Sequence, residues 1–318
     1  MIGKEKQDKS YVKKQSLLKE IKKNKFFYII PIPGIIFLIM FNYIPMAGIY
    51  VAFEKYTYAG GLFGSEFVGL KNFKLFFDNL SYVLRATRNT IVINVGSILL
   101  GIVVNVSVAC ILGEIRSERY RKSVQAITIF PHFLSWIVVG VVADTILNDK
   151  TGVLNRAIQA FGGTGISWSM KSQYWWPILI LFSIWKGFGY GSIVYYATLT
   201  GFDTSMYEAA EVDGANRLQK ITKITIPLLK PTISIMLLLN IGGILGGSLD
   251  QIMGMTKMNP LLYETTDTIT TYVYRSTSGS IDFGLSSAVS LYQSVFGCVL
   301  VLIANMAVKK LDPDYALF

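Results

Sequence analysis

Hydrophobic residues gather in six long runs along this chain. Five of the runs contain no Asp, Glu, Lys or Arg, and the sixth is interrupted only by Lys186. A helix needs about 20 apolar residues to cross the hydrocarbon core of a bilayer, and each run is near or above that length. Core helices of soluble proteins are usually much shorter. The pattern therefore predicts six transmembrane helices, at Phe26–Phe53, Asn89–Gly113, Ser123–Ala143, Ser172–Phe202, Pro231–Leu249 and Phe283–Val308.

The composition supports the same fold class. Charged residues make up 16% of the 318 residues, with a mean hydropathy of +0.46, whereas soluble domains carry roughly 25% charged residues. The first run is too long and has the wrong flanks for a cleaved secretory signal, so we expect it to be retained as a helix. We predict an all-α integral membrane protein.

The distribution of positive charge between the runs predicts the orientation of the chain. With the N-terminus inside, the inner segments hold 19 Lys and Arg in 80 residues, and the outer segments hold 10 in 96. Cytoplasmic loops are rich in Lys and Arg, so both termini are predicted to face the cytoplasm. The net charge of +10 then indicates contact with anionic membrane lipid and no nucleic-acid partner. The inner segments are 1–25, 113–125, 200–231 and 309–318, and the outer ones are 53–88, 147–173 and 253–285.

The chain lacks the residues that catalysis would require. No G-x-x-x-x-G-K-[ST] phosphate loop is present, which predicts that ATP is not bound or hydrolysed by this chain. His132 is the only histidine and cannot form a two-His metal site or the His–Asp pair of a hydrolase; we expect it to be a satisfied helix residue. Cys110 and Cys298 fall inside spans and are expected to pack as small apolar residues. We predict no enzyme activity, no metal and no cofactor in this chain.

Polar residues inside the predicted spans are candidates for a substrate path. A charged side chain at the centre of a span costs about 2.5–3.5 kcal/mol on insertion scales, so Lys186 should face protein or water. It could line a translocation path, or it could pair with a backbone carbonyl or with an acidic group of a neighbouring subunit. The candidates for the path are Lys186, Tyr190, Asn240 and Asp250, although Asp250 is near a span end, where water can solvate it.

Glycines in the fifth predicted span have the spacing of close helix contacts. Gly242 and Gly246 are four residues apart, as are Gly243 and Gly247. Small residues at this spacing let two helices approach closely. We expect helix packing here, within the chain or at a subunit interface.

One polar stretch, between the fourth and fifth spans, has strong local signals. Asp203 or Ser205 can cap a helix start, and Ser205-x-x-Glu208 fits a capping box. Gly214 stands where a left-handed helix terminator is expected. A second helix, Arg217–Ile226, should follow and be broken by Pro227 and Pro231 before the membrane. The stretch is therefore predicted to be a cytoplasmic docking helix, a tight turn and a second helix.

The spacing in this stretch resembles the signature of the membrane subunits of ATP-binding-cassette importers. That signature is E-A-A, three residues, G, nine residues and I-x-[LI]-P, and the chain carries it with Ile226 where leucine is usual. In that family the short helix is the coupling helix, which inserts into a groove of the ATPase subunit. The resemblance implies a coupling or ATPase-contact site at Tyr207, Glu208, Ala209, Ala210, Asp213, Gly214, Ile224 and Pro227, with Glu208 as the polar contact.

Other stretches resemble the permeases of the sugar-transport branch, and most resemble the LplB-type polysaccharide permease group. They are "FNYIPMAGIYVAF", "FVGLKNFKLFF", "WKGFGYGSIVYY" and "NPLLYETTDTITTYVYR". The resemblance implies a type I ABC importer (MetI-like) permease fold and import of oligosaccharides or polysaccharide fragments. It also implies a second, non-identical permease, an ABC ATPase dimer that binds ATP and Mg, and an extracytoplasmic solute-binding protein. The expected parts are a cytoplasmic tail 1–25, a first helix and extracellular loop 26–86, a permease core 87–310 with coupling loop 200–231, and a cytoplasmic tail 311–318.

Three alternatives stay open from the residues. The importer could carry another solute, such as glycerol phosphate or another small polar compound. A secondary transporter driven by an ion gradient would predict an inverted internal repeat, which we do not find, and intramembrane carboxylates. Only Asp144 and Asp250 are acidic candidates, and both are near span ends. A membrane scaffold or receptor subunit that docks a cytoplasmic partner is the non-transport alternative.

Overall fold

The computed structural model describes residues 24–247, 249–279 and 282–311. The predicted cytoplasmic tails therefore lie almost entirely outside the described residues. The chain divides into two compact units, residues 1–50 and residues 51–318, each described here by itself.

The first unit is one helical run in three geometries. It contains α2 (Lys25–Ile29), α3 (Ile32–Leu38), the π-helix η1 (Ile39–Tyr43) and the start of the 3₁₀-helix η2 (Ile44–Phe53). The π-turn ends just before Pro45, which has no N–H to donate to the helix, so the hydrogen-bond register changes there. The run Lys25–Phe53 is long and apolar enough to cross a membrane, which confirms the first predicted span.

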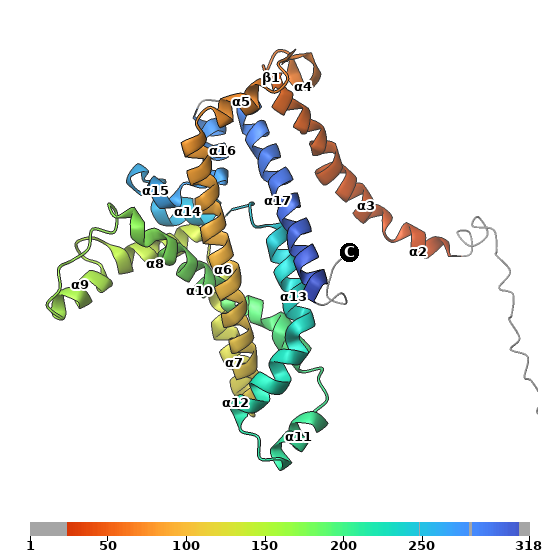
Figure 1. The fold of residues 1–318 in the computed structure, drawn as a ribbon, viewed down its shortest axis with the longest axis vertical. Coiled ribbons are helices and arrows are strands. Elements are labelled where there is room, and N and C mark those ends of the chain that lie inside the picture. The colour runs from red at the N-terminus through yellow and green to blue at the C-terminus, as the bar shows by residue number, and fades with distance from the viewer. Residues whose placement is uncertain (1–23, 248, 280–281, 312–318) are drawn as a thin grey trace, which may run out of the picture. The chain divides into compact units, whose positions relative to one another are not determined.

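The second unit is almost entirely helical in its described part (Figure 1). Its one small sheet pairs β1 with β2 antiparallel, with Glu54 opposite Phe67. The elements are β1 (Glu54–Lys55), α4 (Gly61–Gly64), β2 (Glu66–Phe67), α5 (Lys71–Phe77), α6 (Leu80–Glu114), α7 (Glu118–Ile129), η3 (Phe130–Phe133), α8 (Trp136–Leu147), α9 (Val153–Ala160), η4 (Ser172–Tyr174), α10 (Trp175–Leu199), α11 (Ser205–Val212), α12 (Arg217–Lys220), η5 (Ile221–Thr225), α13 (Ile226–Gly242), α14 (Leu249–Thr256), η6 (Pro260–Leu262), α15 (Tyr263–Thr266), α16 (Ile269–Ser278) and α17 (Phe283–Leu311).

Four further predicted spans correspond to long apolar helices, but the third is bent. Helical segments Glu118–Phe133 and Trp136–Leu147 meet at 98°, so the expected straight helix Ser123–Ala143 is wrong. Pro131 lies in the 3₁₀-turn η3, and Ser135 caps α8 by accepting from the N–H of Val138 at 3.3 Å. A proline and a new N-cap end one helix and start another. The absence of charged residues in Ser123–Ala143 predicted one span and gave no sign of this break.

The fifth span is also displaced from its expected place. The membrane-length helix runs from Arg217 to Gly242, not from Pro231 to Leu249. Neither Pro227 nor Pro231 breaks it. The π-turn η5 lies just before Pro227 and absorbs the change of register there, as η1 does before Pro45, and Pro231 lies inside α13. The helix ends at Gly242, so the expected helical glycine pairs do not form, and Gly247 has a left-handed φ of +53°.

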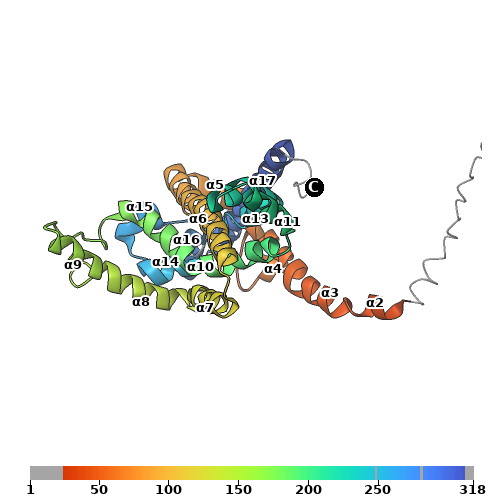
Figure 2. The same ribbon diagram turned by 90° about the horizontal axis from the view of Figure 1, so that it is seen from below.

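The backbones of helices α8 and α14 approach each other closely where the two helices cross. A Cβ added at Gly140 of α8 would lie 1.9 Å from the carbonyl oxygen of Gly254 in α14. Figure 2 shows α14 beside α8, with both extending away from α6, α13 and α17. One buried cluster joins α8 and α14 to α6 and α10; it includes Ile93, Ala143, Leu147, Trp168, Trp175, Leu179, Ile252, Met255 and Leu262.

A buried ion pair joins α16 to the start of α6. Asp267 is 1% exposed and receives two hydrogen bonds from the Arg275 guanidinium, at 2.7 and 2.9 Å. The Tyr82 hydroxyl of α6 donates to the same carboxylate. Burial alone would lower the pKa of Arg275, but the bonds to Asp267 and its charge more than offset this, so the pKa is raised. The bidentate geometry fixes the segment after α14 against α6.

Candidate functional site

The short helix α11 lies at the end of the second unit away from α5 and β1 (Figure 1). It covers Ser205–Val212, where a short helix was predicted, and Gly214 follows it with φ +78°. The N–H of Gly214 donates to Glu211 O at 3.0 Å, and the N–H of Ala215 donates to Ala210 O at 2.8 Å. These are the two bonds of a Schellman terminator, which needs a residue that adopts positive φ without strain. The predicted glycine turn is confirmed.

The predicted capping box at the start of α11 is wrong. Thr204 is the N-cap and makes no side-chain cap hydrogen bond. The Asp203 carboxylate instead accepts from the backbone N–H of Ser205 at 3.0 Å and from its hydroxyl at 2.7 Å. These bonds lower the pKa of Asp203. The capping box of this loop belongs to the next helix, where Asn216 and Gln219 bond reciprocally.

Two side-chain contacts tie α11 to the helix that follows. The Tyr207 hydroxyl lies 3.0 Å from the Thr225 hydroxyl, and the Lys220 ammonium donates to Glu211 at 2.8 Å. The hydrogen bond from Lys220 and its charge lower the pKa of Glu211. Because Lys220 and Thr225 belong to the same continuous helical run as the fifth span, α11 is joined to that span by more than its connecting turn.

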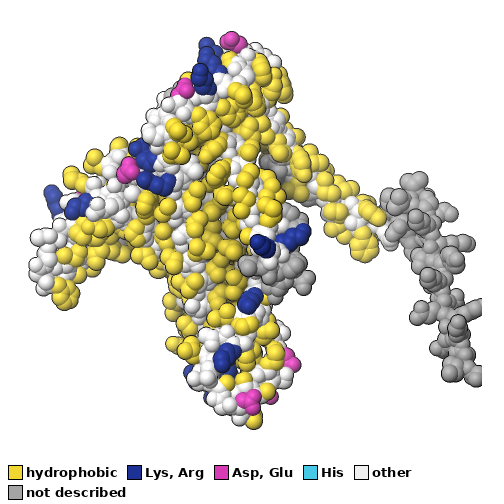
Figure 3. Space-filling view, viewed as in Figure 1, with side chains coloured by type: hydrophobic (Ala, Val, Ile, Leu, Met, Phe, Trp, Pro, Cys, Tyr) yellow, Lys and Arg dark blue, Asp and Glu magenta, His cyan; other side chains and the backbone are white. Residues whose placement is uncertain are grey.

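The other side of α11 is open. Glu208 and Ala209 are exposed, and within the described part of the chain the Glu208 carboxylate has no hydrogen bond or ion pair. Val212 is 89% exposed and Leu218 is 69% exposed. Acidic side chains gather at this end of the unit, while the surface along α6, α13 and α17 is largely hydrophobic (Figure 3). An exposed mixed apolar and acidic tip is typical of a docking surface.

The remaining predicted loop residues divide between the turn and the helix. Asp213 is the C-cap of α11. Ile224 lies in η5, and Pro227 is at the start of α13, where a missing N–H is tolerated. Pro227 therefore continues the second helix, and its expected role as a breaker is wrong.

Two of the four path candidates line a cavity of about 570 Å³ between α6, α10 and α13. They are Tyr190 and Asn240. The Tyr190 ring stacks on His132, with centroids 4.3 Å apart and planes 8° apart. His132 lies in η3, at the bend, with its ring at this cavity, so its expected place within a continuous helix is wrong. Ligand cavities are commonly 300–1,000 Å³.

Buried polar atoms give this cavity hydrogen-bonding capacity. Asn105 Oδ1 and Ser97 Oγ are buried without a hydrogen-bond partner among the described residues, and both residues line the cavity. Buried polar groups are normally paired.

The other two path candidates lie outside this lining. The Lys186 ammonium donates to the backbone carbonyl of His132 at 2.6 Å and lies over the Trp136 ring. Of the alternatives for Lys186, this is pairing with a backbone carbonyl. Asp250 is exposed in the first turn of α14. Cys110 is buried and Cys298 exposed, both free, and no cluster of metal-ligating residues occurs in residues 24–247, 249–279 and 282–311.

Comparison with known families decides between the classes that this geometry allows. The family described as "Binding-protein-dependent transport system inner membrane component" matches residues 97–315, which include the cavity and the loop with α11. The chain belongs to this family. It is a multi-pass permease of the cytoplasmic membrane with the fold of ABC importer membrane subunits.

Relatives of the permease agree over nearly its whole length. It is 34% identical to the polygalacturonan/rhamnogalacturonan transport system permease protein YteP of Bacillus subtilis (strain 168), covering 95% of this chain and 93% of the relative. It is equally similar to Protein LplB of the same organism, covering 94% and 93%. A crystal structure of a bacterial alginate ABC transporter in complex with an alginate pentasaccharide-bound periplasmic protein matches with TM-score 0.81 and 33% identity, covering 93% of this chain and 98% of that chain. The resemblance stated from the sequence is confirmed.

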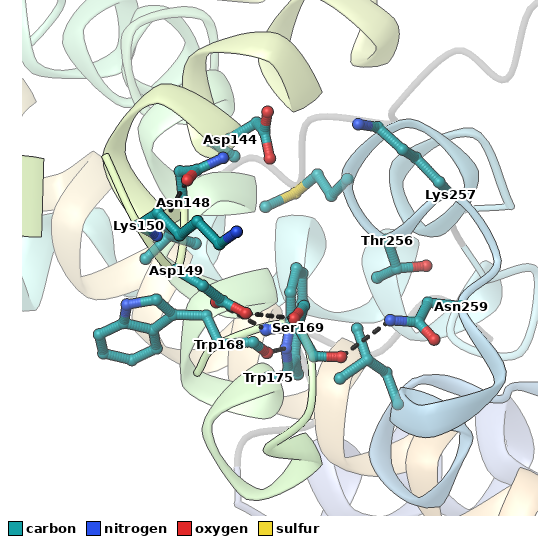
Figure 4. A pocket seen from close by; sticks show the side chains of 14 residues that line it. Asp144, Asn148, Asp149, Lys150, Trp168, Ser169, Trp175, Thr256, Lys257 and Asn259 are labelled. Carbon is teal, nitrogen blue, oxygen red and sulfur yellow. Dashed lines mark hydrogen bonds between the residues drawn. The ribbon is translucent and has the colours of Figure 1, made fainter. Parts of the chain in front are cut away.

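Sequence reasoning missed a second pocket in the permease. This pocket, of about 400 Å³, lies between the end of α8 and the connection after α14 (Figure 4). Asp149, Lys150 and Lys257 come from segments that read as ordinary loops, and Asp144 was noted only as an acidic residue near a span end. The available signal was their mixed charge in two of the predicted outer segments. Nothing in the sequence places the two segments face to face.

Proposed function

We propose that this permease is one of two non-identical membrane subunits of an importer for oligosaccharides or polysaccharide fragments. An extracytoplasmic solute-binding protein delivers the saccharide, and an ABC ATPase dimer drives transport. The observation that carries the proposal is α11, a helix fixed to the fifth span through Tyr207 and Glu211 whose opposite side is exposed.

The mechanism follows from how α11 is attached. The ATPase dimer changes shape when it binds ATP, and α11 seated on it moves as a rigid body, with Glu208 as the polar contact. Because α11 is tied to the helix Arg217–Gly242, its displacement moves a wall of the cavity. The free energy that couples ATP binding to transport is limited to the difference between the binding free energies of α11 for the two ATPase states. ATP and Mg belong to the partner, since the permease has no phosphate loop.

The saccharide assignment is supported by cavity chemistry and by relatives. A sugar presents C–H faces to aromatic rings and hydroxyls to amides, and the cavity offers Tyr190 stacked on His132 beside Asn240 and Asn105. YteP is a polygalacturonan/rhamnogalacturonan permease, and the matched crystal structure is of an alginate transporter. Glycerol phosphate and other small polar solutes are the alternative cargo. Ion-coupled transport is the less favoured mechanism.

Purification of the tagged permease from its native host tests the assembly. We expect an ATPase and a second, related permease to copurify in fixed proportion. Radiolabelled oligosaccharide uptake should be lost when the gene for this permease is deleted, and should return with the wild-type gene. A stable homo-oligomer that imports solute without an ATPase would contradict the proposal. Uptake of glycerol phosphate but of no saccharide would contradict the cargo.

A further inference from the structure

The pocket between α8 and the connection after α14, called here the outer pocket, is unassigned by the transport mechanism above. We propose that it is a subsite for one acidic sugar unit, such as a uronate, of an oligosaccharide entering the permease. The proposal rests on the proposed function, and adds a ligand class and a place. The pocket is lined by the end of α8, by Trp175 and by the two predicted outer segments 147–173 and 253–285, which carry the low Lys and Arg content expected of outer loops.

Three charged side chains and one amide of the outer pocket are uncommitted. Within the described part of the protein, the side chains of Asp144, Lys150 and Lys257 have no ion pair or hydrogen bond, and neither does the Asn148 amide nitrogen. Lys150 and Lys257 reach toward the pocket from opposite sides, and Asp144 stands on α8 (Figure 4). The Asp149 carboxylate also lines the pocket, but it is hydrogen-bonded to Ser169. The groups free to contact a ligand are therefore two ammonium groups and one carboxylate, an excess of one positive charge.

The other polar groups of the pocket are occupied in holding its shape. The Asp149 carboxylate accepts from the Ser169 N–H at 3.2 Å and from its hydroxyl. The Asn259 amide nitrogen donates to Ser169 O at 2.8 Å, which joins the connection after α14 to the wall formed by the α9 loop. The two faces of the pocket are therefore tied together before any ligand arrives, and a preorganised site costs less ordering on binding.

A buried asparagine fixes the wall on the α9 side. The Asn155 side chain donates to the carbonyls of Asp149 and Ile166 at 2.9 and 2.8 Å. Its oxygen accepts from the N–H of Ile166 and from the Trp168 indole at 3.0 and 3.1 Å. These four hydrogen bonds hold the loop that contains Asp149 and Lys150. The backbone position of Lys150 is therefore fixed by a folded loop.

The backbone at Lys257 is also unusual. Lys257 and Met258 have φ of +52° and +55°, which are left-handed values rarely adopted by residues with a side chain. Strained backbone of this kind persists only where its surroundings hold it, and it concentrates at binding sites. In this conformation the Lys257 side chain lies at the pocket, on the side opposite Lys150 (Figure 4).

The pocket also offers an apolar floor for a sugar ring. Leu147, Met255 and Leu262 are buried and line it beneath the charged groups. A pyranose ring has an apolar C–H face and a polar edge, so it fits an apolar floor with a charged rim. Lys150 and Lys257 would bind the carboxylate of a uronate, the Asn148 amide would bind a hydroxyl, and the Asp144 carboxylate would oppose the negative charge of the ligand.

Calorimetric titration of the complete transporter, purified with its second permease and ATPase and without the binding protein, tests the subsite. The probes are trigalacturonate and a neutral galactose trisaccharide. We expect trigalacturonate to bind and the neutral sugar to bind at least tenfold more weakly. The double variant Lys150→Gln/Lys257→Gln should weaken trigalacturonate binding at least tenfold. The control Lys171→Gln, which removes one positive charge from the outer segment that contains Lys150, should change it less than twofold.

A variant of opposite sign separates recognition from damage to the fold. Asp144→Asn removes the free carboxylate, so it should tighten trigalacturonate binding about threefold, which unfolding cannot do. Equal binding by the double variant and the wild type, or equal binding of both probes, would overturn the subsite. ATP-driven saccharide uptake is measured in parallel with the binding protein present. If uptake occurs but trigalacturonate binds equally to the wild type and to these variants, the subsite is refuted and the proposed function stands. If the wild type imports no saccharide, the proposed function is refuted.

Discussion

Gly214 determines the direction of the chain after α11. Its φ of +78° allows the two Schellman bonds that end the helix, and a Cβ there would meet no atom within 4 Å. The constraint on this residue is therefore conformational and not steric. A residue with a branched Cβ resists this conformation most strongly.

Replacing Gly214 by valine should reduce oligosaccharide uptake at least tenfold while leaving the amount of inserted protein unchanged. The left-handed conformation costs an ordinary residue about 1–2 kcal/mol, so α11 would lose its defined end and its seat on the ATPase. Gly201→Ala is the matched control, because Gly201 has no left-handed φ and a Cβ there makes only an ordinary contact. Uptake equal to wild type in Gly214→Val would refute the role of this turn.

Glu208→Lys should uncouple ATP hydrolysis from transport. The carboxylate is exposed and has no partner in the described chain, so reversing its charge should leave the fold intact and disturb only an external contact. We expect the ATPase activity of the purified transporter to lose most of its stimulation by the saccharide-loaded binding protein. Glu118→Lys, a reversal on another predicted cytoplasmic segment, should keep that stimulation; normal coupling in Glu208→Lys would exclude the proposed contact.

At the scale of helices, the sequence predicted the elements with strong local signals. The presence of a short helix at α11 and the turn at Gly214 follow from residues within a dozen positions of one another. The third and fifth spans were misplaced for a different reason. Hydrophobicity indicates which segments can lie in lipid, but it does not indicate where a helix bends. The 98° bend at Pro131 and Ser135 lies within an apolar run and was therefore missed.

The candidate site was predictable to the same extent. The loop that carries α11 was found because its residues are close in sequence. The contact of His132 with Tyr190 depends on helix packing, which joins segments far apart in the chain, and so does the position of Lys150 across the outer pocket from Lys257. Neither packing arrangement has a local signature.

Gly254→Val should destabilise the crossing of α8 and α14. A Cβ at Gly254 would lie 2.3 Å from the Trp136 carbonyl oxygen, and backbone atoms cannot move aside as a side chain can. Overpacking of this kind costs about 3 kcal/mol, which should lower the melting temperature of the purified transporter by several degrees. Gly101→Ala is the control, since a Cβ there meets no atom within 4 Å. An unchanged melting temperature for Gly254→Val would contradict this packing.

For the whole molecule, the orientation in the membrane decides whether α11 can meet an ATPase. Val212 at the end of α11 and Phe161 after α9 are 89% and 93% exposed, so cysteines at these positions are equally accessible to a reagent. With Cys110 and Cys298 replaced by alanine, an impermeant maleimide should label Phe161→Cys in intact cells. Val212→Cys should be labelled only after the membrane is opened. The reverse pattern would place α11 on the wrong side.

Reconstitution of the permease into liposomes, with and without its ATPase, tests the central claim most directly. The measured quantity is labelled oligosaccharide accumulated inside vesicles that contain both permeases, with binding protein on the outside and ATP enclosed. We predict accumulation only when the ATPase and ATP are both present, and its loss in Glu208→Lys. Accumulation without the ATPase, driven by an ion gradient or by none, would contradict the account.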